Sequence, residues 1–177
     1  MMAVYLVLPL LLFGNVTLGS KTMLPADNLF QWEPWTAVSA QFNLPLSPDG
    51  RPIPQNPLIG DLIIQNYVWK QFVNDSLRDG QIPLWTPNLF AGVPFLATGQ
   101  HAALYPFSIF FLILPLTKAY GWYTVSQIWL AGTLAYVFGR VLGMKRPSAG
   151  LMGLASALST VTAVRPNPRS SSCFPSC

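Results

Sequence analysis

The chain has 177 residues, of which 51% are hydrophobic and only 9% are charged. Soluble domains carry roughly 25% charged residues, so this composition argues against a single compact soluble domain. The 17 prolines and 13 glycines exclude a plain helical bundle, because proline removes a backbone donor and breaks helices. We therefore expect apolar membrane segments combined with irregular, turn-rich structure.

The charges divide the chain into two regions. All six acidic residues lie between Asp27 and Asp79, whereas the charged residues from Lys118 onward are all basic. Basic residues beside apolar segments are typical of the cytoplasmic side of a membrane. No aromatic-basic module accompanies them, so nucleic acid is not an expected partner.

The first segment, residues 1–20, is uncharged and is apolar up to Phe13. A span needs ~20 residues, and a signal peptide normally opens with a basic region that is missing here. We expect a first transmembrane span or signal anchor. The alternative is a cleaved signal, which would leave a secreted or anchored domain.

Residues 21–102 read as one long loop, because prolines recur throughout and residues 44–58 can only be turns or extended chain. The exception is residues 61–79. Asp61 is suited to the N-cap and Gly80 to the position after the helix, which predicts a helix between them.

This helix is expected to be amphipathic. One face carries apolar residues at helical spacing, namely Leu62, Trp69, Val73 and Leu77. The polar residues Lys70, Asn74 and Arg78 are expected beside this face. Such a helix suits a membrane surface or a position packed beneath the loop.

Three apolar segments follow the loop. Residues 103–117 are too few to cross a bilayer and predict a re-entrant or interfacial segment. Residues 122–143 are long enough to span, and a third span begins at 148–159. From residue 160 to residue 177 the chain is rich in Pro, Ser and Arg, which predicts a disordered tail and a truncated or frameshifted chain.

These segments together predict a mainly α, polytopic membrane protein in the cell membrane. It would have an N-terminal span, a long extracytoplasmic loop with the amphipathic helix and the re-entrant segment, and one to two further spans. This arrangement leaves the basic pair Lys145 and Arg146 on the cytoplasmic side, as the positive-inside rule requires.

The outer loop combines carboxylates with aromatic residues. Asp27 follows the first span, Asp61 opens the helix, and Gln65 lies one turn after Asp61 on the same side. Carboxylates in this setting suit general-base work on a hydroxyl, or binding of Mg²⁺ or Mn²⁺ that neutralises a phosphate. The structural alternative is that Asp61 only caps the helix, Asp27 is a surface residue, and the tryptophans form an interfacial belt.

Several blocks of the sequence resemble a known family. They are NPLIGDLIIQNYVWKQF, LRDGQIPLWTPNLFAGVPFLATGQHAALYP and LAGTLAYVFGRVLG. In this order they resemble the N-terminal part of YfhO-like bacterial membrane proteins, over residues 25–159. That family is related to the GT-C glycosyltransferases, which take a sugar from a polyprenyl-phosphate carrier. The resemblance implies an acidic base in the first outer loop, at Asp61 or Asp27.

The resemblance implies a function and its substrates. The chain would be the N-terminal part of a glycosyltransferase-like enzyme, inactive alone, that transfers sugar from the carrier to an outer-surface glycan or lipid. Its membrane lipid, donor and acceptor would meet side chains near the two carboxylates, namely Gln65, Trp69, Lys70, Arg78 and Trp85. Lys70 or Arg78 would hold the phosphate. The alternative is a non-catalytic membrane protein whose outer loop binds glycan or a partner subunit.

Overall fold

The computed structural model describes residues 2–42, 44–54, 56 and 59–164, and it is mainly helical. It divides into two compact units, Met1–Met23 with Thr117–Cys177, and Leu24–Leu116. The first unit contains α1 (Met2–Leu12), α2 (Gly14–Thr17), α6 (Leu116–Val141, which begins one residue before this unit) and α7 (Arg146–Val164). The second contains η1 (Ala26–Gln31), η2 (Trp35–Phe42), η4 (Leu62–Asn66), α3 (Tyr67–Arg78), α4 (Phe95–Thr98), η5 (Pro106–Ser108) and α5 (Ile109–Ile113).

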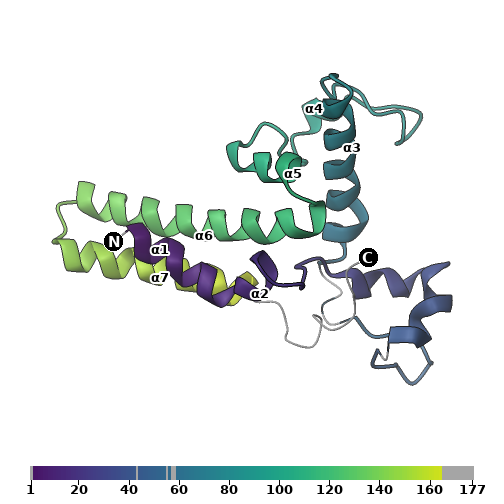
Figure 1. The fold of residues 1–177 in the computed structure, drawn as a ribbon, viewed down its shortest axis with the longest axis horizontal. Coiled ribbons are helices and arrows are strands. Elements are labelled where there is room, and N and C mark those ends of the chain that lie inside the picture. Colours follow the sequence, from purple (N-terminus) through teal and green to yellow (C-terminus); the bar gives the residue numbers. More distant parts are fainter. Residues whose placement is uncertain (1, 43, 55, 57–58, 165–177) are drawn as a thin grey trace. The chain divides into compact units, whose positions relative to one another are not determined.

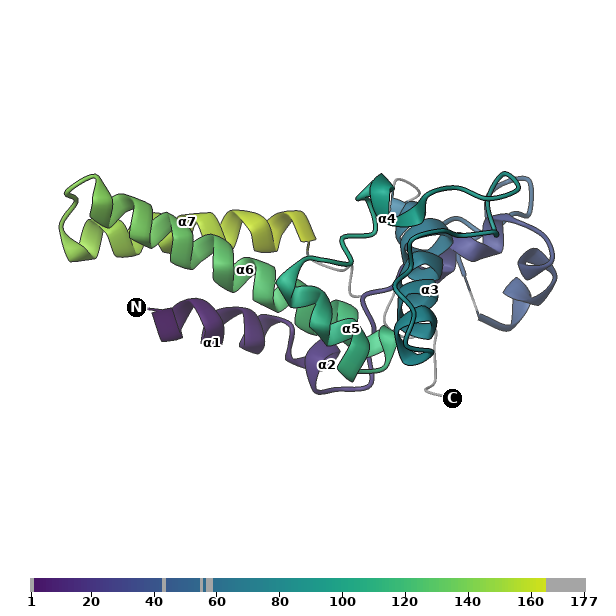
Figure 2. The ribbon, with the colours of Figure 1, turned by 90° about the horizontal axis from the view of Figure 1, so that it is seen from above.

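In the first unit, α6 and α7 lie side by side with opposite directions, and α1 runs along them (Figures 1 and 2). The turn between α6 and α7 contains Gly143, whose φ of +79° is readily adopted only by glycine. Pro147 then occupies the first turn of α7, where a missing N–H costs nothing. The start of α6 is fixed by Lys118, whose ammonium donates to the carbonyl oxygens of Gly19 and Lys21.

Small residues allow these helices to approach closely. Gly132 of α6 and Gly153 of α7 face each other, and the ring of Tyr5 from α1 contacts both. The Tyr5 hydroxyl donates to the Gly150 carbonyl oxygen at 3.0 Å. Burial, together with the neighbouring Tyr136, raises the pKa of Tyr5. This junction depends on the absence of side chains at the two glycines.

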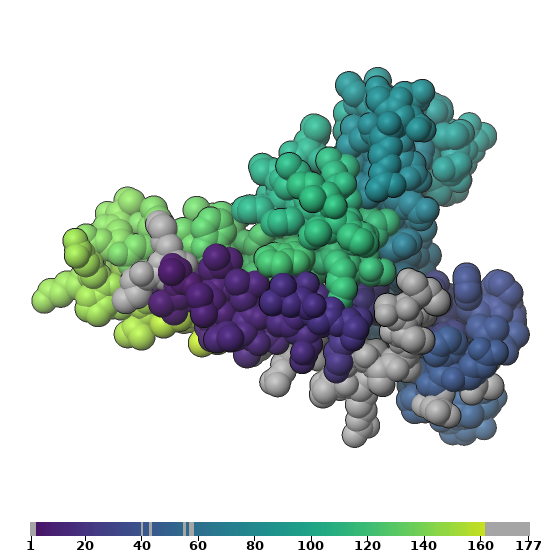
Figure 3. Space-filling model, viewed as in Figure 1, coloured from purple at the N-terminus to yellow at the C-terminus, as the bar shows by residue number. Residues whose placement is uncertain are grey.

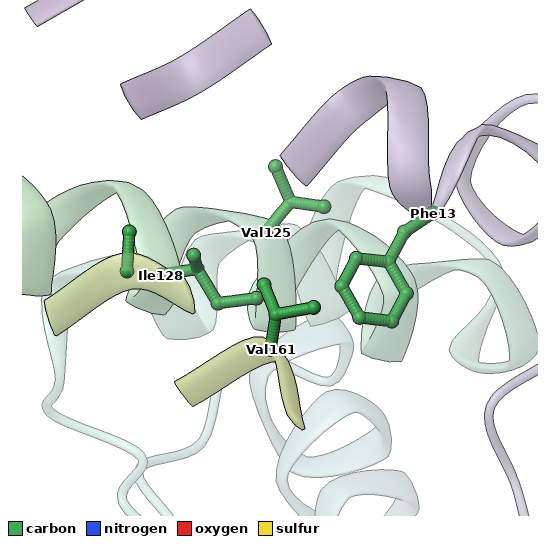
Figure 4. Close-up of a cluster of buried hydrophobic side chains, with 5 residues drawn as sticks. Phe13, Val125, Ile128 and Val161 are labelled. Carbon is green, nitrogen blue, oxygen red and sulfur yellow. The ribbon is translucent and has the colours of Figure 1, made fainter. Parts of the chain in front are cut away.

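A cluster of buried apolar side chains lies farther along the same helices. Phe13, Val125, Ile128 and Val161 point toward one another, and Ala157 completes the cluster (Figure 4). Leu11 of α1 and Leu18, which directly follows α2, are exposed at 77% and 80% of their full exposure. Figure 3 shows these two helices, in purple, at the surface of the molecule.

None of the described helices combines the length and the apolar character that a membrane crossing requires. The expectation of a polytopic membrane protein is therefore wrong. Helix α1 has only 11 residues, which is about half of a span. Helix α6 contains Lys118, Arg140 and many polar or small residues, and α7 is rich in Ala, Gly, Ser and Thr. The prediction counted uncharged stretches as apolar, although such residues contribute little hydrophobic free energy.

The predicted segments correspond to different elements. Residues 122–143 lie largely within α6, and residues 148–159 lie within α7. Helix α7 continues to Val164, so the start of the predicted disordered tail, residues 160–164, is helical. The remainder, residues 165–177, lies outside the described residues. Residues 103–117 contain η5 and α5, followed by extended backbone at Leu114.

The second unit is organised around one longer helix. The helix expected over residues 61–79 is present as the π-helical turn η4 followed directly by α3. Gly80 lies just beyond its end with a φ of +70°, and its N–H donates to the Leu77 carbonyl oxygen. Element η1 packs against η2 and η4, and α5 packs against α3 (Figure 1).

Candidate functional site

The two predicted carboxylates lie on elements that touch. Asp27 belongs to η1 and is only 8% exposed. Asp61 is exposed and immediately precedes η4, which packs against η1. The fold therefore brings together two elements that are more than 30 residues apart in the sequence.

Asp61 does not cap the helix. Its backbone is already helical, with φ −56° and ψ −26°, and its side chain makes no capping hydrogen bond. The expectation of an N-cap is wrong because a cap residue needs non-helical backbone so that its oxygen can reach the following N–H groups. The carboxylate is thus available to solvent, as is the Gln65 side chain one turn later.

Lys70 lies in the interior, only 4% exposed. Its ammonium donates to the Ser108 hydroxyl at 3.2 Å and lies 4.5 Å from the centre of the Phe111 ring. The Ser108 hydroxyl donates to the Ala102 carbonyl oxygen at 2.5 Å. These contacts hold the Lys70 side chain against the segment that contains Ser108 and Phe111, almost 40 residues later in the sequence.

Asn74, one turn after Lys70, is fixed in the same way. Its Nδ2 donates to the Phe111 carbonyl oxygen at 2.6 Å, and its buried Oδ1 has no hydrogen-bond partner among the described residues. The buried face of α3 consists of Lys70, Val73 and Asn74. The sequence placed Lys70 and Asn74 beside the apolar face and Leu77 within it, but Leu77 is 41% exposed. The predicted buried face was therefore wrong. The hydrogen-bond partners that allow Lys70 and Asn74 to be buried, Ser108 and Phe111, come from a distant segment that the local pattern does not show.

These side chains border a cavity of about 190 Å³. It is lined by Lys70, Val73, Asn74, Leu77, Ala103, Tyr105, Pro106, Ser108, Ile109, Phe111 and Leu112. Among the described residues, this lining includes one cation, two neutral polar side chains besides Tyr105, and no Asp or Glu. Desolvation by burial lowers the pKa of Lys70 to about 8, because low-polarity surroundings disfavour the charged amine.

An aromatic cluster adjoins the other side of α3. The Phe95 ring forms T-shaped pairs with the rings of Trp69 and Phe72, and it stacks on His101 with centroids 4.3 Å apart. The Ala103 N–H donates to Nδ1 of His101, so the neutral ring carries its proton on Nε2 and donates to the Phe95 carbonyl oxygen at 3.0 Å. Trp69, predicted to bind substrate, therefore also packs against this cluster.

The other two predicted binding residues lie on the surface. Arg78 is exposed in the last turn of α3. Trp85 is 56% exposed and covers Gly92, where an added Cβ would come within 2.6 Å of the indole ring. Of the predicted site residues, only Lys70 lines the cavity, whereas Asp61, Gln65, Arg78 and Trp85 are exposed.

Neither a group of metal ligands nor a known relative was found that would assign a function to these side chains. The metal finding concerns the described residues. Over the described part of the chain, no group of three or more His, Cys, Asp or Glu side chains could hold a metal ion. The expected Mg²⁺ or Mn²⁺ is neither supported nor excluded by this finding. Comparisons with protein-family models, curated proteins and solved structures found no significant match. The resemblance to YfhO-like proteins stays a prediction from the sequence.

The buried amine makes stability depend on pH. In the folded chain Lys70 loses its proton near pH 8, whereas its ordinary value is 10.5. Between these values the unfolded state binds more protons, so the free energy of unfolding rises with pH. We expect Lys70→Met to remove roughly 1–2 kcal/mol of this rise.

Urea unfolding of both proteins at several pH values between 7 and 10.5 measures this difference. Lys145→Met removes an exposed lysine and serves as the matched control. Its free energy of unfolding should depend on pH in the same way as that of the wild type. Equal slopes for the wild type and Lys70→Met would show that burial does not disfavour the charged amine.

Proposed function

We propose that this chain takes part in the transfer of a sugar from a polyprenyl-phosphate carrier to an outer-surface glycan or lipid. The observation that carries the proposal is the exposed Asp61 carboxylate, which makes no capping hydrogen bond and directly precedes an element that packs against the one holding Asp27. The resemblance of residues 25–159 to YfhO-like proteins supports the same assignment.

In this proposal Asp61 acts as the general base. Its carboxylate takes the proton from the acceptor hydroxyl, whose oxygen attacks the anomeric carbon of the donor. The bond between that carbon and the phosphate oxygen breaks, and the carrier phosphate leaves with the bonding electrons. Gln65, exposed one turn after Asp61, can hydrogen-bond a sugar hydroxyl. Mg²⁺ or Mn²⁺ belongs to the same proposal, since carboxylates such as Asp27 and Asp61 supply the oxygen ligands that these ions prefer.

A second candidate is glycan binding without catalysis. It is favoured by tryptophans whose rings are about half exposed, namely Trp32, Trp35 and Trp85. An exposed indole face is suited to packing against a sugar ring. This candidate does not require a carboxylate, and that difference separates it from sugar transfer.

Sugar transfer to acceptor, followed with a radiolabelled carrier-linked donor in cell extracts, tests the proposal. Because the chain is proposed to be part of an enzyme and inactive alone, cells producing the complete enzyme are compared with cells producing its double variant Asp27→Asn/Asp61→Asn at equal protein level. We expect the double variant to lose transfer. Unchanged transfer together with retained glycan binding would support the second candidate instead.

A further inference from the structure

The end of the hairpin formed by α6 and α7 carries exposed apolar side chains. They recur at spacings of three and four residues along one face of α6 and continue into the turn, namely Leu134, Val137, Phe138, Val141 and Leu142. The two nearest the turn, Val141 and Leu142, are 79% and 62% exposed. This end of the hairpin extends beyond the start of α1 (Figures 1 and 2). A contiguous exposed apolar surface of this kind is typical of an interaction site.

Three exposed basic residues lie at the same end of the hairpin, namely Arg140, Lys145 and Arg146. The first unit contains no Asp or Glu, so no carboxylate of this unit neutralises them. Lys145 directly precedes α7 and Arg146 begins it. The positive end of the helix dipole disfavours cations there, so the stability of α7 does not account for these two residues.

The turn between the helices has a defined backbone. The Gly143 N–H donates to the Arg140 carbonyl oxygen and the Met144 N–H to the Gly139 carbonyl oxygen, both at 3.1 Å. The Arg140 guanidinium donates to the Met144 carbonyl oxygen at 2.7 Å. Gly139 also lies against Ala149 of α7, since an added Cβ would come within 3.2 Å of the Ala149 Cβ. The apolar and basic side chains are therefore displayed together by two packed helices.

We propose that this hairpin end binds an anionic lipid surface. The basic side chains contact the negatively charged headgroups, and the apolar side chains enter the acyl layer directly beneath them. A lipid surface offers these two kinds of partner at the depths that such a combination requires. A second copy of the chain, bound through the same face, would bring the cations of both copies together, and like charges repel. The contact does not involve Asp27 or Asp61, so it is independent of the sugar-transfer proposal.

Flotation of the full chain with lipid vesicles tests the charged part of this surface. We expect binding to vesicles of phosphatidylglycerol and phosphatidylcholine, little binding to phosphatidylcholine alone, and weaker binding as salt is added. Arg146→Glu should weaken binding about tenfold or more, because each basic residue near an anionic surface raises binding about fivefold and this change also adds a negative charge. A glutamate at the start of α7 suits the helix dipole, so the fold should be retained. Arg51→Glu makes the same change at an exposed position of the second unit and should bind as the wild type does.

A dye attached at the turn tests the apolar part. Leu142→Cys, in a chain that also carries Cys173→Ser and Cys177→Ser, is labelled with an environment-sensitive fluorophore. Its emission should rise and shift to the blue with anionic vesicles, whereas the same dye on Asp49→Cys, an exposed position of the second unit, should not respond.

Four results would overturn the proposal. They are absence of wild-type flotation with anionic vesicles, equal binding to neutral and anionic vesicles, equal binding of Arg146→Glu and Arg51→Glu, and a dye at position 142 that does not respond. The first two use the wild-type chain, so they decide even if a variant fails to fold. Self-association that Leu142→Ser abolishes, in a chain that does not float, would assign the surface to a second copy instead.

Discussion

In the complete enzyme of which this chain would be a part, Asp61→Asn is expected to reduce sugar transfer by ~10²–10⁴-fold, the usual contribution of a positioned general base. The substitution is nearly isosteric and removes the charge that accepts the proton. It should leave the fold intact, because the Asp61 side chain is exposed and makes no capping hydrogen bond. A transfer assay at equal protein level, with circular dichroism as a check on folding, measures the effect.

Asp27→Asn distinguishes the two carboxylates. Asp27 is buried in η1, so its replacement can change both structure and activity, and thermal unfolding must be measured alongside transfer. If Asp61→Asn retains wild-type transfer and Asp27→Asn is folded but inactive, Asp27 is the base. Full activity in both variants would rule out a catalytic role for these carboxylates.

Gly153→Val is expected to destabilise the first unit by ~1–3 kcal/mol or more, the usual cost of overpacking an interior. A Cβ at Gly153 would come within 2.6 Å of the Tyr5 hydroxyl oxygen and 2.7 Å of the Gly132 carbonyl oxygen. The tyrosine side chain can move, but the carbonyl belongs to the backbone of α6. The helices must therefore separate, and the hydrogen bond from Tyr5 to Gly150 should weaken.

Hydrogen exchange of peptides from α1, α6 and α7 measures this loss in the first unit directly. Gly14→Val is the matched control, since an added Cβ at Gly14 meets nothing within 4 Å. Faster exchange is expected in Gly153→Val and not in the control. Equal exchange in the two variants would mean that the contact among Tyr5, Gly132 and Gly153 does not hold the helices together.

The sequence correctly located features that depend on neighbouring residues. It placed a helix before Gly80, because a left-handed backbone after a helix favours glycine wherever it occurs. It failed on the membrane spans, because it counted uncharged stretches such as those in α6 and α7 as apolar. The prediction of an N-cap at Asp61 was also wrong, because the backbone of Asp61 is already helical. The residue at which the first turn begins was not fixed by the local pattern.

By itself, then, the sequence determined the mainly helical character and the helix that ends before Gly80, whereas the role of the candidate carboxylates stays a prediction. Only the tertiary structure decided that η1 packs against η4, that Gly132 faces Gly153, and that Lys70 enters the interior. A lysine on an amphipathic helix is normally solvated, because burying a charge is costly. Here Ser108 and the ring of Phe111 receive its ammonium, and these partners are brought to Lys70 by the fold of a distant segment that no local pattern around Lys70 encodes.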